Sequence, residues 1–213
     1  MDGLMILVGQ YDSPFVRRVA IALGHYGLPY EHRPWSVWGQ ADEIAELNPL
    51  RRVPVLVLDS GEVLVESAAI LDALDEMVPP ERALLPRSGA ARRAGLRVCA
   101  LASGLADKAV SLLYEGVLRS EAARSATWIA RCQAQMRDTL DVLESERAER
   151  PGDFFLEAFS HADIAVACVL RFVAEAHPSI LETMPRLALS AHARHYESTE
   201  LFQRIAQPLH VQI

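Results

Sequence analysis

The pattern of apolar residues changes in a stretch rich in proline between residues 79 and 90. Before it, short apolar runs alternate with segments of helical spacing, and after it only long amphipathic stretches follow. The stretch holds Pro79, Pro80, Pro86 and Gly89, residue types that interrupt regular structure. A length of 213 residues also fits two domains of roughly 100 residues each. We therefore predict an N-terminal domain over 1–79, a linker over 80–89 and a C-terminal domain over 90–213.

The first eighty residues alternate between strand and helix signals. Residues 4–8 form a short apolar run typical of a buried strand, and the helical spacing after it starts at Pro14 and stops at Gly27. Asp59-Ser60-Gly61 between two short apolar runs indicates an antiparallel hairpin. The predicted order is β-α-β-α-β-β-α, a compact α/β unit that begins with a parallel βαβ. The predicted strands are 4–8, 30–35, 55–58 and 63–65, and the predicted helices are 14–27, 41–47 and 66–77.

The remainder of the chain shows no alternation typical of strands. We predict an all-α bundle from amphipathic stretches over 90–118, 121–149, 161–176 and 184–206. His192 and His195 lie three residues apart in the last stretch. No cysteine or acidic residue is in register with them, so we interpret them as solvated surface histidines and predict no metal site.

Charge and cysteine usage exclude several classes of function. Residues 1–80 carry 5 Arg against 12 Asp and Glu, and residues 81–213 carry 16 basic and 16 acidic residues. An acidic N-terminal half disfavours nucleic acid and anionic membrane surfaces as partners. The sequence has no apolar run of the ~20 residues needed to span a bilayer and no signal-peptide pattern at its start. Three scattered cysteines, Cys99, Cys132 and Cys168, are typical of reduced core thiols, so we expect a cytoplasmic protein.

Three places in the first half suit a ligand. Ser13 directly precedes Pro14 and is a natural N-cap, where helix N–H groups favour an anion. Val53-Pro54 stands at the start of a strand, and a cis bond there would leave the Val53 backbone free to pair with an extended ligand. Glu66-Ser67 lies between strand and helix, where Ser67 suits a carboxylate and Glu66 an ammonium group. Each place also has an interpretation without a ligand. Ser13 and Glu66-Ser67 could be helix caps only, and Pro54 could be an ordinary trans proline at a sheet edge. Nearby polar residues that are further candidates are Gln40, Arg51, Arg52 and Arg17.

Together these segments resemble a known family. The segments Tyr11-Asp12-Ser13-Pro14-Phe15-Val16-Arg17-Arg18, Asn48-Pro49-Leu50-Arg51-Arg52-Val53-Pro54 and Leu64-Val65-Glu66-Ser67-Ala68 resemble the thioredoxin-like domain of cytosolic glutathione transferases. In the helical half, Ser160-His-Ala-Asp163 matches the capping box of that family. The resemblance covers essentially the whole chain and is nearest to serine-type sequences, plant tau-like and bacterial.

The resemblance implies a homodimer that takes glutathione as co-substrate, with no metal. Val53 and the cis-proline Pro54 would bind the cysteinyl unit, and Glu66 and Ser67 the γ-glutamyl end. Ser13 matches the catalytic hydroxyl of serine-type classes, where omega-like classes carry a cysteine. Arg52 and Gln40 are further candidate glutathione-binding residues.

The implied chemistry is attack by a glutathione thiolate on a hydrophobic electrophile. A free thiol of pKa ~8.5 is only about 3% ionised at neutral pH, and a hydroxyl donor beside a helix N-terminus favours the anion. Ser13 would donate its O–H to the sulfur, and Tyr11 is the alternative donor, because other classes use a tyrosine close to this place. The candidate residues of the hydrophobic substrate site are Tyr11, Phe15, Leu112, Tyr114 and Phe172, several of which fit a generic core role nearly as well.

Two other functions stay open at this stage. One is a glutathione-dependent isomerase, dehalogenase or peroxidase for a single metabolite, although Asp12-Ser13-Pro14 departs from the Ser-Ser-Cys run of the isomerase class. The other is a non-catalytic homologue that binds glutathione or another ligand.

Overall fold

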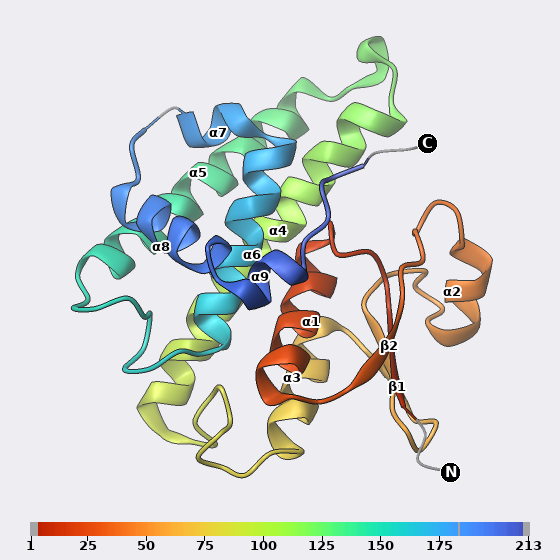
Figure 1. Ribbon diagram of the computed structural model, residues 1–213. Coiled ribbons are helices and arrows are strands. Elements are labelled where there is room, and N and C mark those ends of the chain that lie inside the picture. The colour runs from red at the N-terminus through yellow and green to blue at the C-terminus, as the bar shows by residue number, and fades with distance from the viewer. Residues whose placement is uncertain (1–3, 183, 211–213) are drawn as a thin grey trace. The chain divides into compact units, whose positions relative to one another are not determined.

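The computed structural model describes residues 4–182 and 184–210, which divide into two compact units. The first unit contains the chain up to Arg87 together with a C-terminal segment from Thr199 onward, and the second runs from Ser88 to Ser198. The α-helices of both units and the first two strands are labelled in Figure 1.

The first unit is built on a four-stranded mixed sheet. Its strands are β1 (Met5–Val8), β2 (Tyr30–Arg33), β3 (Val55–Val57) and β4 (Val63–Val65), in the order β2-β1-β3-β4. β1 pairs with β2 in parallel and with β3 antiparallel, and β3 pairs antiparallel with β4. This topology confirms the predicted α/β unit, with its parallel βαβ followed by a hairpin.

Three helices cover the two faces of this sheet. They are α1 (Pro14–Tyr26), α2 (Ala41–Leu47) and α3 (Ser67–Glu76). Figure 1 shows α1 and α3 on one face and α2 on the other. On the α2 side, Val8, Ile44 and Val55 form a buried cluster, and apolar side chains that include Trp35 and Val53 pack around it. Buried apolar area of this kind is the main favourable term in folding.

The second unit is helical. It contains α4 (Gly89–Leu118), a 3₁₀ turn (Glu121–Ala123), α5 (Ala126–Ala148), α6 (His161–Ala176), α7 (Pro178–Glu182) and α8 (Leu187–Glu197). α6 is the core helix, since most of its residues are buried and it packs against α4, α7 and α8. The observed elements confirm the predicted all-α character of this half. No helix among the described residues is both long and apolar enough to cross a membrane.

Two predicted helices have different boundaries in the structure. The stretch 121–149 begins with the 3₁₀ turn, and α5 starts only after Ser125, whose side chain accepts a hydrogen bond from the Trp128 N–H. The stretch 184–206 is divided into α8 and α9 (Glu200–Arg204), and α7 before it was not predicted. Pro185 precedes α8, and the chain leaves helical geometry between Glu197 and Glu200. A pattern of apolar residues persists across such short breaks, and so it did not reveal them.

The C-terminal segment that carries α9 packs on α1 of the first unit. The buried Arg17 side chain donates to the backbone carbonyls of Ile205 (2.8 Å) and Phe202 (2.9 Å). Gly24 allows this approach, because a Cβ atom there would lie 2.6 Å from Leu201 Cδ1. The segment is thus held on α1 by hydrogen bonds and by close packing.

The predicted capping box at the start of α6 is confirmed. The Asp163 carboxylate accepts from the Ser160 backbone N–H (2.9 Å) and from the Phe155 N–H (2.8 Å), while Ser160 caps the first turn. His192 of α8 lies against this turn, with Nε2 3.1 Å from the Asp163 carbonyl oxygen and its ring against Phe155.

The interpretation of both histidines as solvated was wrong for one of them. His192 is 4% exposed, whereas His195 is exposed. Burial also lowers the pKa of His192 to about 4. The two side chains project differently because residues three apart on a helix are displaced by about 60°, which is enough to separate a core position from a surface position.

Candidate active site

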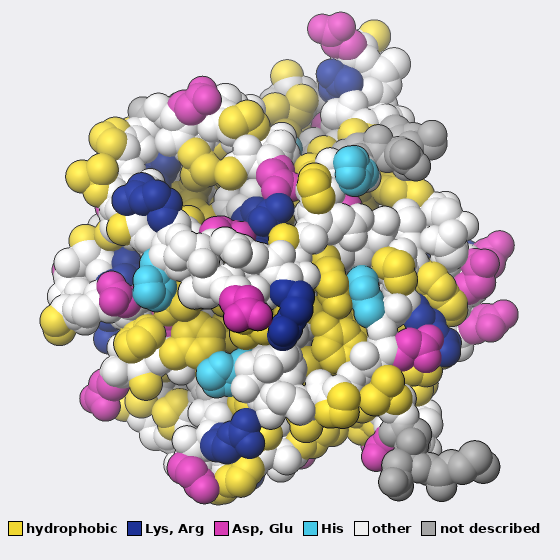
Figure 2. All heavy atoms as spheres, in the orientation of Figure 1, with side chains coloured by type: hydrophobic (Ala, Val, Ile, Leu, Met, Phe, Trp, Pro, Cys, Tyr) yellow, Lys and Arg dark blue, Asp and Glu magenta, His cyan; other side chains and the backbone are white. Residues whose placement is uncertain are grey.

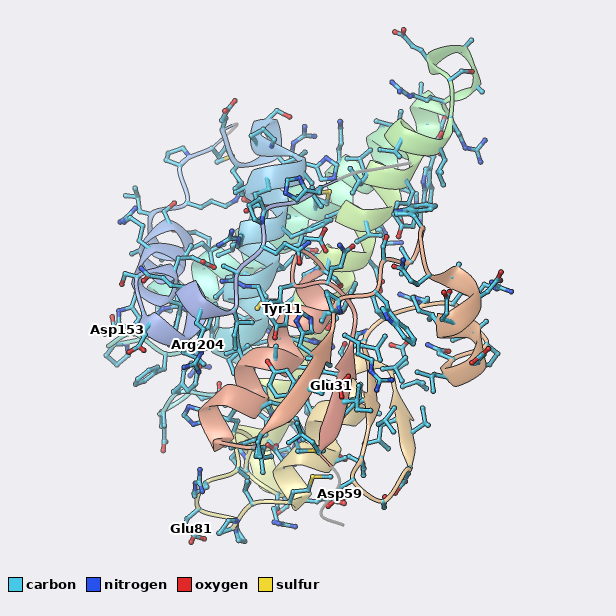
Figure 3. All side chains as sticks on the ribbon, turned by 45° about the vertical axis from the view of Figure 1, so that its right-hand side comes forward. Tyr11, Glu31, Asp59, Glu81, Asp153 and Arg204 are labelled. Carbon is cyan, nitrogen blue, oxygen red and sulfur yellow. The ribbon has the colours of Figure 1, made fainter. Side chains whose placement is uncertain are left out.

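The sheet register brings three sequence motifs to one end of the sheet. Val8 pairs with Val55, and Val55 pairs with Val65, so these residues form one row across β1, β3 and β4. The chain continues from β1 to Ser13, enters β3 from Val53-Pro54 and leaves β4 at Glu66-Ser67. The hairpin turn at Asp59 lies at the opposite end of the sheet, well away from Tyr11 (Figure 3).

Ser13 is the N-cap of α1, as predicted. Its backbone is extended, and its Oγ accepts from the Val16 N–H at 3.4 Å. Within the described residues no protein group accepts the Ser13 hydroxyl proton. The side chain is half-buried, so the O–H can donate to a ligand placed at the helix N-terminus.

Gly9 determines how closely Val53 approaches α1. It has φ of +126°, and a Cβ atom there would lie 2.5 Å from Val16 Cγ2 and 2.8 Å from Val53 Cβ. Glycine is therefore required on both conformational and steric grounds. Gly9 was not among the predicted site residues, although a glycine directly after a buried strand was the available signal.

Val53 presents a free backbone beside the sheet. The Val53-Pro54 bond is cis, and the N–H and C=O of Val53 make no hydrogen bond to another described protein group. The loop before it is held by the buried Asn48, which donates to the Arg52 carbonyl (2.9 Å) and accepts from the Leu50 N–H (3.1 Å). In the sequence Asn48 stands out only as part of a segment that resembles the family, and the structure adds this role in ordering the loop.

Glu66 and Ser67 begin α3. Glu66 has φ of +67°, and its exposed carboxylate lies 3.8 Å from the Arg52 guanidinium. α3 has no side-chain cap, so its first N–H groups are available to an anion. Ser67 is buried, and its Oγ accepts a 2.5 Å hydrogen bond from Arg18 Nη2. Glu66, its neighbour Ser67 and Arg52 therefore lie close to one another.

The other polar candidates near this end are engaged locally. Gln40 Oε1 accepts from the Ser36 N–H at 2.8 Å and closes the turn before α2. Arg51 pairs with Asp42 at 2.6 Å, and both side chains are exposed. Figure 2 shows acidic side chains gathered over α2, in agreement with the negative charge of this half.

Tyr11 makes contacts that differ from those of Ser13. Its hydroxyl lies 2.7 Å from the Tyr30 hydroxyl, its ring stacks on His32 at 3.9 Å, and its N–H donates to Gln207 Oε1. Burial and the Tyr30 hydrogen bond raise the pKa of Tyr11 well above its usual range. The phenol therefore stays protonated and is already paired with another hydroxyl.

The candidates for the hydrophobic substrate site are divided between the units. Tyr11 and Phe15 belong to the first unit and are half-buried, and Phe15 lies against the Arg18 guanidinium. Leu112 and Tyr114 are half-buried on α4, whereas Phe172 is 4% exposed in the core of the second unit. Such burial is typical of a core residue.

A cavity of about 530 Å³ lies between α6, α7 and α8 in the second unit. None of the predicted site residues lines it. Two arginines in its wall are paired within the protein, Arg171 with Glu175 and Glu197, and Arg186 with Asp141. The described residues contain no group of three or more His, Cys, Asp or Glu that could hold a metal ion.

The fold and the site define the class of protein. An α/β unit brings together a serine that caps a helix, a backbone segment without hydrogen-bond partners before a strand, and the uncapped start of a second helix. A helical unit follows it in the chain. Comparison with known proteins agrees with this class. The family model of the glutathione S-transferase N-terminal domain matches residues 7–82, and that of the C-terminal domain matches residues 126–194.

Individual relatives cover most of the chain. The uncharacterized GST-like protein YibF of Escherichia coli is 32% identical over 79% of this chain and 82% of its own length. Glutathione S-transferase U24 of Arabidopsis thaliana is 29% identical over 78% of this chain and 72% of its own. The chain therefore belongs to the cytosolic glutathione transferase superfamily.

Solved structures show the same architecture. A glutathione S-transferase from Methylobacterium radiotolerans, in complex with glutathione sulfonate, matches with a TM-score of 0.86 and 29% identity over 98% of this chain and 99% of its own. A glutathione S-transferase from Methylobacillus flagellatus with bound glutathione matches with a TM-score of 0.87 and 26% identity, over 96% and 100% of the two chains.

Proposed function

We propose that this protein is a glutathione transferase that activates the glutathione thiol for attack on hydrophobic electrophiles. The observation that carries the proposal is the meeting of Ser13, Val53 and the start of α3 at one end of the sheet. Glutathione is an extended tripeptide with a carboxylate at each end and a thiol in the middle. The three motifs offer it a helix start, a strand backbone and a hydroxyl donor in that arrangement.

In this proposal the cysteinyl unit pairs with Val53. Its free N–H and C=O provide one donor and one acceptor, which is how an extended peptide adds to a sheet edge. Glu66 binds the γ-glutamyl ammonium group, and Ser67 with the first amides of α3 binds the carboxylate. Two relatives of known structure hold glutathione or its sulfonate, which supports the choice of ligand.

Ser13 is the catalytic residue of the proposal. Its O–H donates a hydrogen bond to the sulfur. This hydrogen bond and the N-terminus of α1 both stabilise the thiolate more than the thiol. Together they lower the thiol pKa by ~2 units, about 2.7 kcal/mol of preference for the anion. The thiolate then attacks the electrophilic carbon, a carbon–sulfur bond forms, and the leaving group departs with the bonding electron pair.

Ser13 is a better candidate than Tyr11 because of their hydrogen bonds. The Ser13 proton has no acceptor in the described protein, whereas the Tyr11 hydroxyl is 2.7 Å from Tyr30. Either hydroxyl of this pair can be the donor, so Tyr11 has a proton for a ligand thiolate only when Tyr30 donates to it. We assign Tyr11 to the wall of the electrophile site, together with Phe15.

The electrophile, the homodimer and a cytoplasmic location are further parts of the proposal. Leu112 and Tyr114 of α4, in the second unit, stay predictions from the sequence, and the homodimer is what membership of the family implies. Assays with an aryl halide, a peroxide and an isomerisable substrate separate a general conjugating enzyme from one devoted to a single metabolite. Retention on immobilised glutathione without any turnover would instead indicate a non-catalytic homologue.

The test is the substitution Ser13→Ala, measured by aryl halide conjugation and by glutathione affinity. We expect the turnover number to fall by about 10²-fold or more, the magnitude typical of losing one oxyanion-hole donor, with glutathione affinity nearly unchanged. Ser60→Ala, in the exposed hairpin turn at the other end of the sheet, is the matched control. Unchanged turnover in Ser13→Ala would reject the assignment, and loss of turnover in Tyr11→Phe alone would transfer it to Tyr11.

A further inference from the structure

Arg18 is a buried cation that is fixed at the start of α3. It is 5% exposed and donates from Nη2 to Ser67 Oγ at 2.5 Å. The Phe15 ring lies 5.7 Å from its guanidinium carbon and covers it from the side of α1. Burying an arginine is costly unless its donors are used, so the bond to Ser67 is a specific feature of the fold.

The bond from Arg18 determines what the Ser67 hydroxyl can do. Because Oγ accepts from Arg18, the hydroxyl hydrogen remains for another acceptor, and the described protein supplies none. Ser67 is 2% exposed, so a ligand can reach its hydroxyl from one side only, whereas the next residue, Ala68, is exposed. A hydroxyl donor and uncapped helix amides are thus arranged beside each other.

A carboxylate is the ligand group that this arrangement fits. It accepts several hydrogen bonds at once, and the partial positive charge of the helix N-terminus favours it. The Arg18 guanidinium does not contact the carboxylate itself. Through its hydrogen bond to Ser67 Oγ it polarises the Ser67 hydroxyl and fixes the first turn of α3. Without it, the Ser67 side chain can rotate and the amides lose their alignment.

We propose that Arg18 is a positioning residue that aligns Ser67 and the start of α3 to recognise the γ-glutamyl carboxylate. This inference rests on the proposed glutathione function and deepens it. Arg18 acts through Ser67, so it controls affinity for one end of glutathione and not the chemistry at sulfur. The effect of removing Arg18 should therefore disappear when the ligand lacks that carboxylate.

Arg17 provides a matched control from the same helix turn. It is buried to a similar degree, at 2% exposure, but it donates to the backbone carbonyls of Phe202 and Ile205 instead of Ser67. Arg17→Met and Arg18→Met make the same chemical change at equivalent depth. Both should lower thermal stability, and only Arg18→Met should alter recognition of the carboxylate.

The experiment compares two ligands by calorimetric titration of the full chain. One is glutathione, and the other is 4-aminobutyryl-cysteinylglycine, which lacks only the γ-glutamyl carboxylate. We expect the wild type to prefer glutathione by about tenfold or more, the equivalent of about 1.4 kcal/mol, and Arg18→Met to lose most of this preference. Arg18→Lys, which keeps a donor for Ser67, should retain part of it, and Arg17→Met should retain all of it.

Kinetics and the double variant complete the test. Arg18→Met should raise the KM for glutathione about tenfold and leave kcat within about twofold, since Ser13 is untouched. Combining Arg18→Met with Ser67→Ala should add little to either alone, because the two residues act as one unit. If Arg18→Met does not fold, Arg18→Lys and Ser67→Ala carry the same comparison.

The outcomes separate the two proposals. A wild type that binds neither ligand overturns the proposed function, and the role of Arg18 with it. A wild type that prefers glutathione, together with an Arg18→Met variant that keeps the same preference, overturns this inference alone. Equal loss of preference in Arg17→Met would also overturn it, because the effect would then be a general consequence of destabilising α1.

Discussion

Single residues decide how close the parts of the proposed glutathione site come to one another. Ser13 could be identified from the sequence because an N-cap needs only a local pattern, and the structure confirms that cap. Gly9 could not be identified in this way, because its importance depends on Val16 and Val53, which approach it only in the fold. The burial of His192 depends in the same way on its neighbours across helices.

Replacing Gly9 by alanine tests this close approach. A Cβ atom would meet Val16 and Val53 in a backbone conformation that side chains rarely adopt, so we expect the free energy of unfolding to fall by about 3 kcal/mol or more. Chemical denaturation measures the loss, and glutathione affinity should weaken with it. Gly61→Ala is the control, since Gly61 also has positive φ but faces open space and should cost only about 1 kcal/mol. Equal losses in both variants would contradict the steric explanation.

At the scale of elements, local signals predicted the strands and longer helices well. The hairpin of β3 and β4 and the helices α1, α2 and α6 lie within a residue or so of their predicted ends, because caps, glycines and prolines mark them. α7 and the break between α8 and α9 were missed, since a helix of five residues has too few positions to show a period. The contact between α6 and α8 through His192 joins residues that are far apart in sequence, so no local pattern could predict it.

The junction of α6 and α8 should make stability depend on pH. The buried His192 has a pKa of about 4, below the ~6.5 of an unfolded histidine. The unfolded chain therefore binds the proton first, and stability is lost as the pH falls from about 6.5 to 4, by up to roughly 3 kcal/mol. Burial raises the pKa of Asp163, which acts with the opposite sign, so the comparison must be between variants.

Denaturant unfolding of His192→Gln against the wild type measures this dependence. Glutamine keeps a donor for the Asp163 carbonyl and does not titrate, so we expect its unfolding free energy to change less over this pH range. The exposed His195→Gln is the control and should follow the wild type. Identical pH profiles for His192→Gln and the wild type would show that His192 does not carry the effect.

At the scale of the whole molecule, the chain order and the compact units do not coincide. The segment from Thr199 onward follows the helical unit in sequence but belongs to the first unit, where Arg17 holds its carbonyls. The predicted domain boundaries placed everything after residue 90 together, because sequence patterns contain no information on where a terminal segment returns. The two compact units divide between Arg87 and Ser88.

Removal of this segment tests its contribution to the first unit. Truncation after Ser198 leaves the buried Arg17 without two of its acceptors, so we expect a loss of about 3 kcal/mol or more in unfolding free energy. Fluorescence of Trp35 and Trp38, in variants that lack Trp128, follows the first unit. Arg17→Met should destabilise the full chain more than the truncated chain, and additive effects of the two changes would contradict the role given to Arg17.

The central proposal is that a glutathione thiol ionises beside Ser13, and titration of the bound thiol tests it most directly. The ultraviolet absorbance of the thiolate, followed against pH in the saturated complex, gives the thiol pKa without an electrophile. We predict a value ~2 units below the ~8.5 of a free thiol in the wild type, a return toward the free value in Ser13→Ala, and little change in Tyr11→Phe. A bound thiol that titrates like the free one, or whose shift depends on Tyr11 and not on Ser13, would contradict the proposal.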